Sequence, residues 1–512
     1  MGEASEPPVD NLESLARSRF GDLSEAELRL LRSAPMGDTA QCGPSADGGH
    51  PANDPAKADQ WGSDREIRAE LIRWLCVDSE PTKRIDPRGI RVRAAKVTGK
   101  LDLSFAIVPF PLRLFRCRLD KNADLTCAGI PLLNLDGTWT RSLTADGVNV
   151  AGSVFLRGGF TAEGEVRLLG ARIGDTLDCN GGTFKNPGQN ALHADRVRVT
   201  GGVFLSDGFT AEGEVRLLGA EIGRDLTCTG GTFSSLSAQT AVIKGNFFWR
   251  QVKNAESAQL DLTNASVGAL VDGRTSWPTP GNLTLDGFTY TRIFAGPEDA
   301  PARLEWLARL DRFTLQPYRQ LARVLRETGD DRGARRVLLE MEYRRRKEQE
   351  RNSPARLWSW VLRVTIGYGQ LPRRALGWLA ALVAIGFVFS YFGYFNGAIR
   401  PTEKDAYSTF EQQGQPPPYY PRFHALAYSV EHSFPFVNLG QKDHWAPNPQ
   451  GAARTAGTPP KSPEPSRHLR RVRIHPFNSA GFLRWWLWFQ VLAGWVLATL
   501  FVAGLTGIVK SG

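Results

Sequence analysis

The sequence predicts a mainly β protein, in which a right-handed parallel β-helix solenoid is followed by a helical hairpin and two C-terminal transmembrane helices. Three observations lead to this fold class. A thirteen-residue motif repeats within a region of short, alternating apolar runs. The segment after this region carries apolar residues at helical spacing. Two long stretches near the C-terminus contain no charged residue, as membrane spans require.

The repeat lies in residues 90–296, which we assign to the solenoid. Residues 159–171 read GFTAEGEVRLLGA, and residues 208–220 repeat the same thirteen residues 49 positions later. Such a unit cannot bury its own apolar face, so successive units stack as coils. We expect the 49-residue unit to cover two coils, with Leu168 and Leu217 in the core. A β-sandwich with a duplicated segment is the alternative.

The residues before the repeats are expected to contribute only a small cap. Residues 1–60 are rich in Pro, Gly, Ser, Asp and Ala, a composition typical of disorder, with one short helix expected at Leu23–Leu31. Ser63–Glu66 (SDRE) matches a capping box, and apolar residues then follow at helical spacing. Residues 61–89 should therefore hold a capping helix at Asp64–Cys76 and a lead-in that protects the open edge of the first coil.

Residues 297–352 are predicted to form a helical hairpin that breaks at Thr328–Asp331, and residues 353–374 an interfacial segment. The apolar residues at helical spacing in the hairpin are Tyr318, Leu321, Ala322, Leu325, Ala334, Val337 and Leu338. A basic residue beside a span is worth roughly 1 kcal/mol against an anionic membrane surface. The candidate lipid-headgroup contacts are Arg344, Arg345, Arg346, Arg373 and Arg374. These residues account for the net charge of +10 without a nucleic-acid partner.

The predicted transmembrane helices are residues 375–395 and 485–509. Each is longer than the roughly 20 residues needed to cross the hydrocarbon core of a bilayer. Aromatic residues such as Tyr391 and Trp485 lie near their ends, where amphipathic rings favour the headgroup region. A pair of buried core helices is the alternative. The loop between them, residues 396–484, should contain a short re-entrant or interfacial helix at His424–Ser433.

The repeats and the layout resemble a known group of proteins. The stretch LTADGVNVAG at 143–152 resembles the loose A(D/N)LXX coils of pentapeptide-repeat-like proteins. The whole arrangement, from about Ile67 to the C-terminus, is similar to bacterial β-helix membrane proteins of that kind, which are often named membrane-associated oxidoreductases. The resemblance implies a β-helix with a C-terminal membrane anchor and implies little about biochemistry.

An irregular segment, Phe434–Gln441, follows the short helix between the spans. The order span, short helix, loop, span is the layout of two-helix ion channels, and the stretch resembles their pore region. Asn438, Gly440 and Gln441 replace the threonine and paired glycines of a potassium filter and are the candidate pore-loop residues. The alternative is a compact amphipathic loop that lies outside the membrane.

Signatures of common enzyme classes are missing from the sequence. It contains no GxGxxG after a strand, no GxxxxGK[ST], no GxSxG and no HExxH. Glu431 and His432 are interpreted as ordinary neighbouring residues. We therefore predict no catalytic residue and no cofactor, and do not expect an enzyme.

Carboxylates and thiols in the repeats are interpreted as structural. Two carboxylate pairs recur with the coil, which favours a solvated face: Glu163 with Glu165, and Glu212 with Glu214. None of the six cysteines forms a CxxC pair, so no metal site is predicted. Cys127, Cys179 and Cys228 each follow an apolar-polar step, which predicts a stack of small buried thiols.

The first functional hypothesis is a membrane-anchored scaffold whose β-helix face binds a protein partner. The alternative is a channel-like protein whose pore loop near residues 434–441 is regulated by the cytosolic β-helix. A homo-oligomer is compatible with this alternative. Residues 1–60 carry no basic segment followed by an apolar run, and arginines crowd the entry to the first span. We expect a multi-pass protein of the inner (cell) membrane, with the β-helix in the cytoplasm and residues 396–484 outside.

Overall fold

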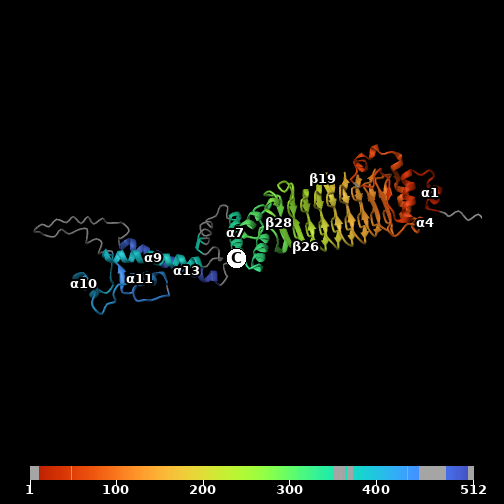
Figure 1. Ribbon diagram of the computed structural model, residues 1–512. Helices are drawn as coiled ribbons and strands as arrows, with labels where there is room; N and C mark the ends of the chain where they lie inside the picture. Colours follow the sequence, from red (N-terminus) through yellow and green to blue (C-terminus); the bar gives the residue numbers. More distant parts are fainter. Residues whose placement is uncertain are drawn as a thin grey trace, which may run out of the picture. The chain divides into compact units, whose positions relative to one another are not determined.

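The computed structural model describes residues 11–47, 49–349, 361, 364–365, 373–434, 436–448 and 480–505. The chain divides into two compact units, Met1–Leu338 and Leu339–Gly512. The first unit is built around a parallel β-solenoid of about nine turns, and helices follow it (Figure 1). The second contains two helices long and apolar enough to cross a membrane. The predicted parallel β-helix and the two apolar helices are therefore confirmed.

Each turn of the solenoid has four sides, and each side adds a strand to one of four parallel ladders. The first ladder contains β3 (Ile90–Arg93), β6 (Leu112–Phe115), β10 (Leu133–Asn134), β14 (Val154–Phe155), β18 (Leu177–Asp178), β21 (Val203–Phe204) and β24 (Leu226–Thr227). The second contains β4 (Lys96–Thr98), β7 (Arg118–Leu119), β11 (Trp139–Thr140) and β15 (Thr161–Ala162). The third contains β5 (Leu101–Asp102), β8 (Ala123–Asp124), β12 (Leu143–Thr144), β16 (Val166–Arg167), β27 (Gln259–Asp261) and β29 (Leu283–Thr284). The fourth contains β9 (Gly129–Ile130), β13 (Asn149–Val150), β17 (Arg172–Ile173), β20 (Arg198–Val199) and β23 (Glu221–Ile222).

Six longer strands turn a corner and join two ladders each. The strands that join the second and third ladders are β19 (Thr183–His193), β22 (Thr210–Arg216) and β25 (Thr232–Ser237). Those that join the fourth and first are β26 (Val242–Trp249), β28 (Ser266–Asp272) and β30 (Thr289–Ile293). The four ladders thus merge into a 16-stranded and a 14-stranded sheet.

The strand register confirms that the 49-residue repeat covers two coils. Leu192 pairs with Val166 in the preceding turn and with Val215 in the next. These two turns therefore span 26 and 23 residues. The extra length of the first comes from an irregular stretch inside β19, where the register shifts between Lys185 and Asn190.

The core of the solenoid is filled by inward-pointing residues of all four ladders. Leu168 and Leu217 are fully buried, as predicted, whereas Glu163 and Glu212 are exposed. A column of aromatic rings runs through the later turns, with neighbouring ring centroids 5.2–5.4 Å apart, in the order Phe160, Phe184, Phe209, Phe233 and Trp249. Such contacts add to the free energy gained by burying the rings.

Several corners of the coil use a repeated side-chain turn. Asp102 Oδ1 accepts hydrogen bonds from the backbone N–H of Ser104 at 3.0 Å and from its hydroxyl at 2.7 Å. Asp124 with Thr126, and Asp261 with Thr263, repeat this arrangement. The next residue then has a positive φ, as at Cys127. Cys127 is therefore exposed at a corner, so its predicted burial is wrong, whereas Cys179 and Cys228 are buried as predicted. They do not form a stack, because Leu205 lies between them in the register of the first ladder.

The predicted disorder of residues 1–60 is wrong for residues 11–47 and 49–60. This stretch forms α1 (Leu12–Phe20), α2 (Glu25–Ser33), η1 (Ala34–Met36), β1 (Ala40–Gln41), η2 (Pro51–Asn53) and η3 (Pro55–Gln60). Strand β1 pairs with β3, and the buried Glu27 carboxylate bonds Arg68 at 2.8 Å. Composition underestimated this segment because it is stabilised by covering the first coil and not by a core of its own.

The predicted capping helix begins later than expected. Ser63–Arg65 form the 3₁₀ turn η4 and Glu66–Arg68 form β2, so α3 spans only Ala69–Val77 and is followed by α4 (Ser79–Thr82). No side-chain cap is formed at the start of η4. A capping box is instead present at α2, between Ser24 and Glu27. β2 pairs with β4 and so continues the second ladder. This pairing gives the open edge of β4 a backbone partner.

Helices close the other end of the solenoid. They are α5 (Ala300–Leu307) and α6 (Gln316–Glu327), preceded by η5 (Arg274–Ser276) and followed by α7 (Asp331–Gln349). The break at Thr328–Asp331 is confirmed, with Gly329 at a φ of 89°. Gln316 Nε2 donates to Phe288 O at 2.9 Å, and Gln320 Nε2 to Tyr290 O at 2.6 Å. These side chains satisfy backbone carbonyls of the last turn that another coil would otherwise satisfy.

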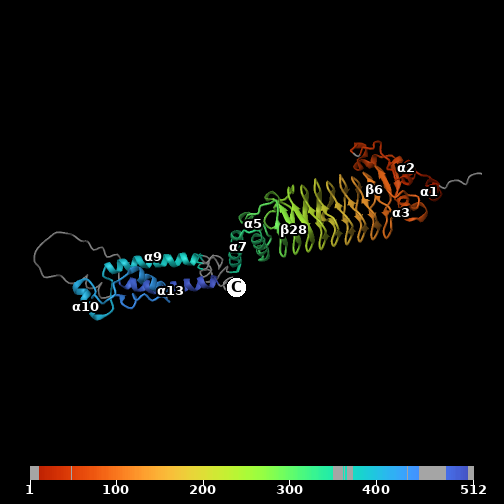
Figure 2. The same ribbon diagram turned by 60° about the horizontal axis from the view of Figure 1, so that its bottom comes forward.

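The second unit contains α9 (Arg373–Phe395), β31 (Ile399–Pro401), α10 (Lys404–Gln413), α11 (Ala425–Ser433), β32 (Trp445–Pro447) and α13 (Ala480–Leu505). The helices α9 and α13 lie side by side in both views (Figure 2). They are antiparallel, because the ring of Phe389 meets that of Trp486 edge to face at 4.9 Å while Gly386 lies beside Gln490. The short helix predicted at His424–Ser433 is present as α11. Helix α10 was not predicted.

Candidate pore-loop region of the second unit

Helix α11 is wedged between α9 and α13. Two glycines permit this approach. A Cβ atom at Gly386 of α9 would overlap Ser429 Oγ, and one at Gly494 of α13 would overlap the backbone of Ser433. Small residues at helix contacts are the usual means by which membrane helices approach closely. The sequence around these glycines therefore creates room for a third helix between the two apolar ones.

A buried polar cluster connects α11 to both long helices. Gln490 Nε2 lies 2.9 Å from Ser429 Oγ, 2.8 Å from Ser433 Oγ and 3.0 Å from Ser429 O. Ser429 Oγ in turn donates to Val383 O of α9 at 2.8 Å. Gln490, Ser429 and Ser433 are all fully buried. Hydrogen bonds of this kind fix one helix against another in an apolar environment.

The loop after α11 is organised around the carboxylate of Glu431, which is 2 % exposed. Its Oε2 accepts from the backbone N–H of Gln441 at 2.8 Å and of Lys442 at 2.9 Å. Its Oε1 accepts from Leu439 N at 3.2 Å. A buried carboxylate requires such donors, so the three amides and Glu431 fix one another. Glu431 thus holds the returning chain against the end of α11.

The three candidate pore-loop residues have different environments. Asn438 is exposed, and its Oδ1 accepts from Gly440 N at 2.9 Å. Gly440 has a φ of +74°, and among the described residues, its two chain neighbours apart, no atom lies within 4 Å of the position of a Cβ. Gln441 is buried, and its side chain bonds His424 N at 3.0 Å and Arg422 O at 3.3 Å. Asn438 and Gly440 therefore face open space, whereas the side chain of Gln441 stabilises the loop.

Residues of β31, α10, α11 and β32 pack around a small aromatic core in this unit. Its buried members include Ile399, Phe410, Tyr420, Tyr428 and Trp445. The ring of Tyr394, near the end of α9, stacks on that of Phe423 at 4.7 Å. The end of α9, the start of α13 and the beginning of α11 therefore meet in one aromatic cluster.

The candidate lipid-headgroup arginines fall into two groups. On α7, Arg344 lies 2.9 Å from Glu340, while Arg345 and Arg346 lie 3.6 and 2.6 Å from Glu342. These cations are thus partly neutralised within their helix. Arg373 and Arg374 are exposed at the first turn of α9. Cations are unfavourable at a helix N-terminus because of the helix dipole. A contact outside the helix therefore explains the position of these two arginines better than the helix dipole does.

The solenoid thiols and carboxylates form no evident chemical centre. Burial raises the pKa of the Cys42 and Cys117 thiols to about 12 and raises the pKa of the Cys179 thiol well above its ordinary value, so these thiols stay protonated. Among the described residues, no group of three or more His, Cys, Asp or Glu side chains could hold a metal ion.

Sequence reasoning missed two residues of the region around α11. Glu431 was dismissed as an ordinary neighbour of His432, although it organises the loop. Gln490 was overlooked because it carries no charge. A glutamine inside a long apolar stretch was the available signal, since polar side chains at such positions are expensive unless they have partners.

Comparisons of this chain with protein-family models, with curated proteins and with solved structures found no match.

Proposed function

We propose that this chain is a subunit of an oligomeric, channel-like membrane protein in which α11 and the loop after it re-enter the bilayer between two spans, α9 and α13. The observation that carries this proposal is the level at which α11 meets the two long helices. Both contacts lie far from the helix ends, and so at the depth of the hydrocarbon region if the helices span.

The level follows from the helix geometry. Gly386, which contacts Ser429, is nine residues before the end of α9 at Phe395. At 1.5 Å per residue this is about 13 Å along the helix. Gly494, which contacts Ser433, is fourteen residues after the start of α13, or about 21 Å. Helix α11 therefore descends from the aromatic cluster toward the middle of the hairpin, and the chain returns through the Glu431-bound loop.

A loop at that depth needs cover, because irregular backbone is tolerated within a bilayer only where protein buries it or water fills a cavity. Phe436 is 76 % exposed and Leu439 49 % exposed, and the polar group of Asn438 is exposed beside them. Further copies of the same chain, arranged around the loop, would cover the apolar side chains and leave Asn438 and Gly440 toward a hydrated centre. This supports the channel-like hypothesis over a monomeric scaffold.

The topology belongs to the same proposal. The chain would lie in the cell membrane with the solenoid in the cytoplasm, where it regulates the module or receives a partner. Apart from the re-entrant α11 and the loop after it, residues 396–448 would then lie on the outer side together with the start of α13. The exposed Arg373 and Arg374 would contact headgroups on the cytoplasmic side, as the charge asymmetry of membrane proteins favours.

Ion flux through proteoliposomes containing the full chain tests the proposal. We expect flux in the wild type, and expect an impermeant cationic thiol reagent to block it in Asn438→Cys and not in the wild type. Tyr419→Cys is the matched control, since Tyr419 is an exposed residue of the same inter-helix segment outside the loop. Absence of flux under every voltage and lipid tried, with a monomeric particle, would contradict the proposal and favour the membrane-anchored scaffold.

A further inference from the structure

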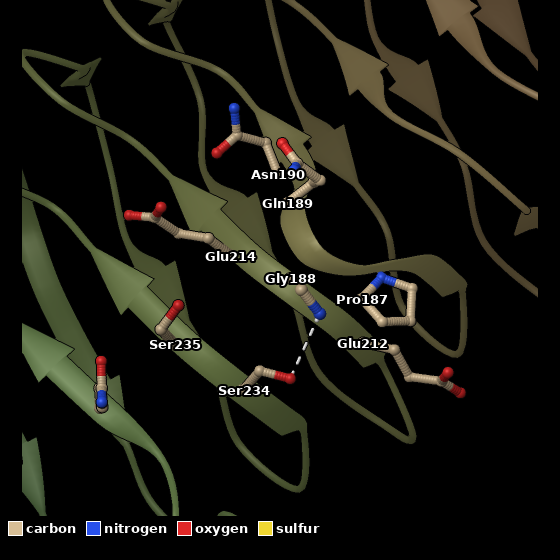
Figure 3. A pocket seen from close by; sticks show the side chains of 10 residues that line it. Pro187, Gly188, Gln189, Asn190, Glu212, Glu214, Ser234 and Ser235 are labelled. Atoms are coloured by element: carbon tan, nitrogen blue, oxygen red, sulfur yellow. Dashed lines mark hydrogen bonds between the residues drawn. The ribbon is translucent and has the colours of Figure 1, made fainter.

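The outer face of the solenoid carries a polar hollow beside the irregular part of β19. Its volume is about 670 Å³, and the residues that matter here are Asn190, Glu212, Glu214, Ser234, Ser235 and Gln259. Figure 3 shows Glu214 between Asn190 and Ser235 along the stack, with Glu212 at the other end near Pro187. A hollow of this size matches small-ligand sites, which measure roughly 300–1,000 Å³.

The two identical repeats offer an internal comparison for Glu214. In the first repeat, Glu165 has the same position, and the next turn supplies nitrogen groups to it. Its Oε1 lies 3.3 Å from Asn190 Nδ2 and 3.1 Å from His193 Nδ1. The carboxylate of the first repeat is therefore satisfied by a planar amide and an imidazole from the turn above.

The next turn does not provide these groups to the second repeat. Ser235 pairs with Glu214, and Ser237 pairs with Arg216. These two serines stand in the turn above the second repeat at the places that Asn190 and His193 take in the turn above the first. Ser235 is shorter than an asparagine and leaves space beside Glu214. Within the described part of the solenoid, the carboxylate of Glu214 has no hydrogen bond or ion pair. The hollow thus lies where the longer Asn side chain of the first-repeat arrangement is missing, whereas Ser237 is buried outside its lining.

Backbone geometry keeps this space open and defined. Gly213 has a φ of +147°, and a Cβ atom there would lie 2.7 Å from Gln189 O in the irregular stretch of β19. Its N–H donates to Ser234 Oγ at 3.2 Å, and Ser234 Oγ bonds Ala211 O at 3.1 Å. The floor is therefore rigid, and the ligand-facing groups project from paired strands and not from a free loop.

We propose that this hollow binds a guanidinium group, which supplies to Glu214 the two N–H donors that Asn190 and His193 supply to Glu165. A planar guanidinium can bond a carboxylate in a bidentate manner and still donate to neighbouring oxygens, here those of Ser235 and Gln259. The source is an arginine side chain of a partner protein or a free small guanidinium compound. This inference concerns the solenoid and is independent of the proposed channel-like function.

Calorimetric titration of the full chain in detergent tests the site. The probes are agmatine, a Gly/Ser peptide with one arginine, and the same peptide with citrulline. We expect the arginine peptide to bind and the citrulline peptide not to bind. Binding of agmatine as well identifies a small-molecule source, and binding of the peptide alone identifies a protein source. Absence of binding by both guanidinium probes overturns the proposal.

Variants locate the binding. Glu214→Gln should weaken it about tenfold or more, because a hydrogen bond to a charged group is lost. Glu163→Gln is the matched control in the first repeat and should bind as the wild type does. Ser235→Asn with Ser237→His rebuilds the first-repeat contacts, so it should abolish binding while the fold is kept. Unchanged affinity in Glu214→Gln or in the rebuilt variant would overturn the assignment.

Discussion

Arg303 and Asp272 form a bidentate ion pair at the end of the apolar core of the solenoid. Arg303 Nη1 lies 2.7 Å from Asp272 Oδ2, and Nη2 lies 2.6 Å from Oδ1. Both side chains are at most 2 % exposed. Asp272 pairs in register with Trp249 of the preceding turn, so a carboxylate follows a core indole in the same column. The pair therefore fastens α5 to the end of β28, where the pairing of β28 with β30 has already stopped at Leu270.

Removing one partner of this pair should strongly destabilise the solenoid. Arg303→Met leaves the Asp272 carboxylate buried without its cation, which costs about 3–5 kcal/mol. The free energy of unfolding can be measured by urea denaturation of the full chain in detergent. Arg274→Met is the control, because its 3.8 Å contact with Glu305 is exposed and should be worth at most about 1 kcal/mol. Equal effects would show that the buried pair is not needed.

Truncating a core leucine of the repeat should cost far more than neutralising a surface glutamate. Leu168→Ala and Leu217→Ala should each lower the free energy of unfolding by about 2–5 kcal/mol, since both side chains are fully buried. Glu163→Gln and Glu212→Gln should change it by less than about 0.5 kcal/mol. Similar losses in the two classes would contradict the register of the coil.

Two of the three glycines of α9 should respond differently to a bulky substitution. Gly386→Leu places a side chain where Ser429 and Gln490 lie, and should displace α11 and lower the melting temperature of the protein in detergent. Gly377→Leu is the control, because no described residue outside the backbone of α9 and the two chain neighbours has an atom within 4 Å of its Cβ position. A tolerated Gly386→Leu would contradict the wedged position of α11.

The turn at Asp102 should make a pH-dependent contribution to stability. The Ser104 hydroxyl and backbone N–H bonds lower the pKa of Asp102 to about 2, against 3.8 for a free side chain. Because the folded pKa is the lower one, this contribution is present above about pH 4 and is lost as the pH falls toward 2.

Ser104→Ala should consequently lower the melting temperature at pH 7, and its difference from the wild type should shrink as the pH falls from 4 to 2. Ser104→Thr keeps the hydroxyl and should behave as the wild type does. A difference that stays constant over this interval would show that the turn carboxylate is not responsible.

The repeats allowed much of the solenoid to be predicted, because a coil that stacks on copies of itself meets the same environment each time. Leu168 and Leu217 could be placed in the core for this reason. Cys127 could not be placed by analogy with Cys179, since similar tripeptides stand at different positions in the coil and only the register shows which one turns a corner.

The caps and the region around α11 were harder to predict because their residues are stabilised by distant partners. Glu27 is polar and belongs to a segment of disorder-like composition, yet it is buried through its bonds to Arg68. Glu431 likewise acquires its role only when the chain returns to place three amides around it. Neither partner lies at a spacing that a periodic pattern detects.

The uniform stacking of the coils gives the first unit a length that changes only in whole steps. Nine steps separate Ile90 from Ile293 along the first ladder, and parallel strands lie about 4.8 Å apart, so the two are held about 43 Å from one another. Excising one turn, such as the 21 residues from Leu112 to the residue before Leu133, would shorten this distance by one step and leave both capped ends intact. Backbone hydrogen bonding thus sets the length of the solenoid in steps of one strand spacing, and duplication of its 49-residue unit lengthens it by two such steps.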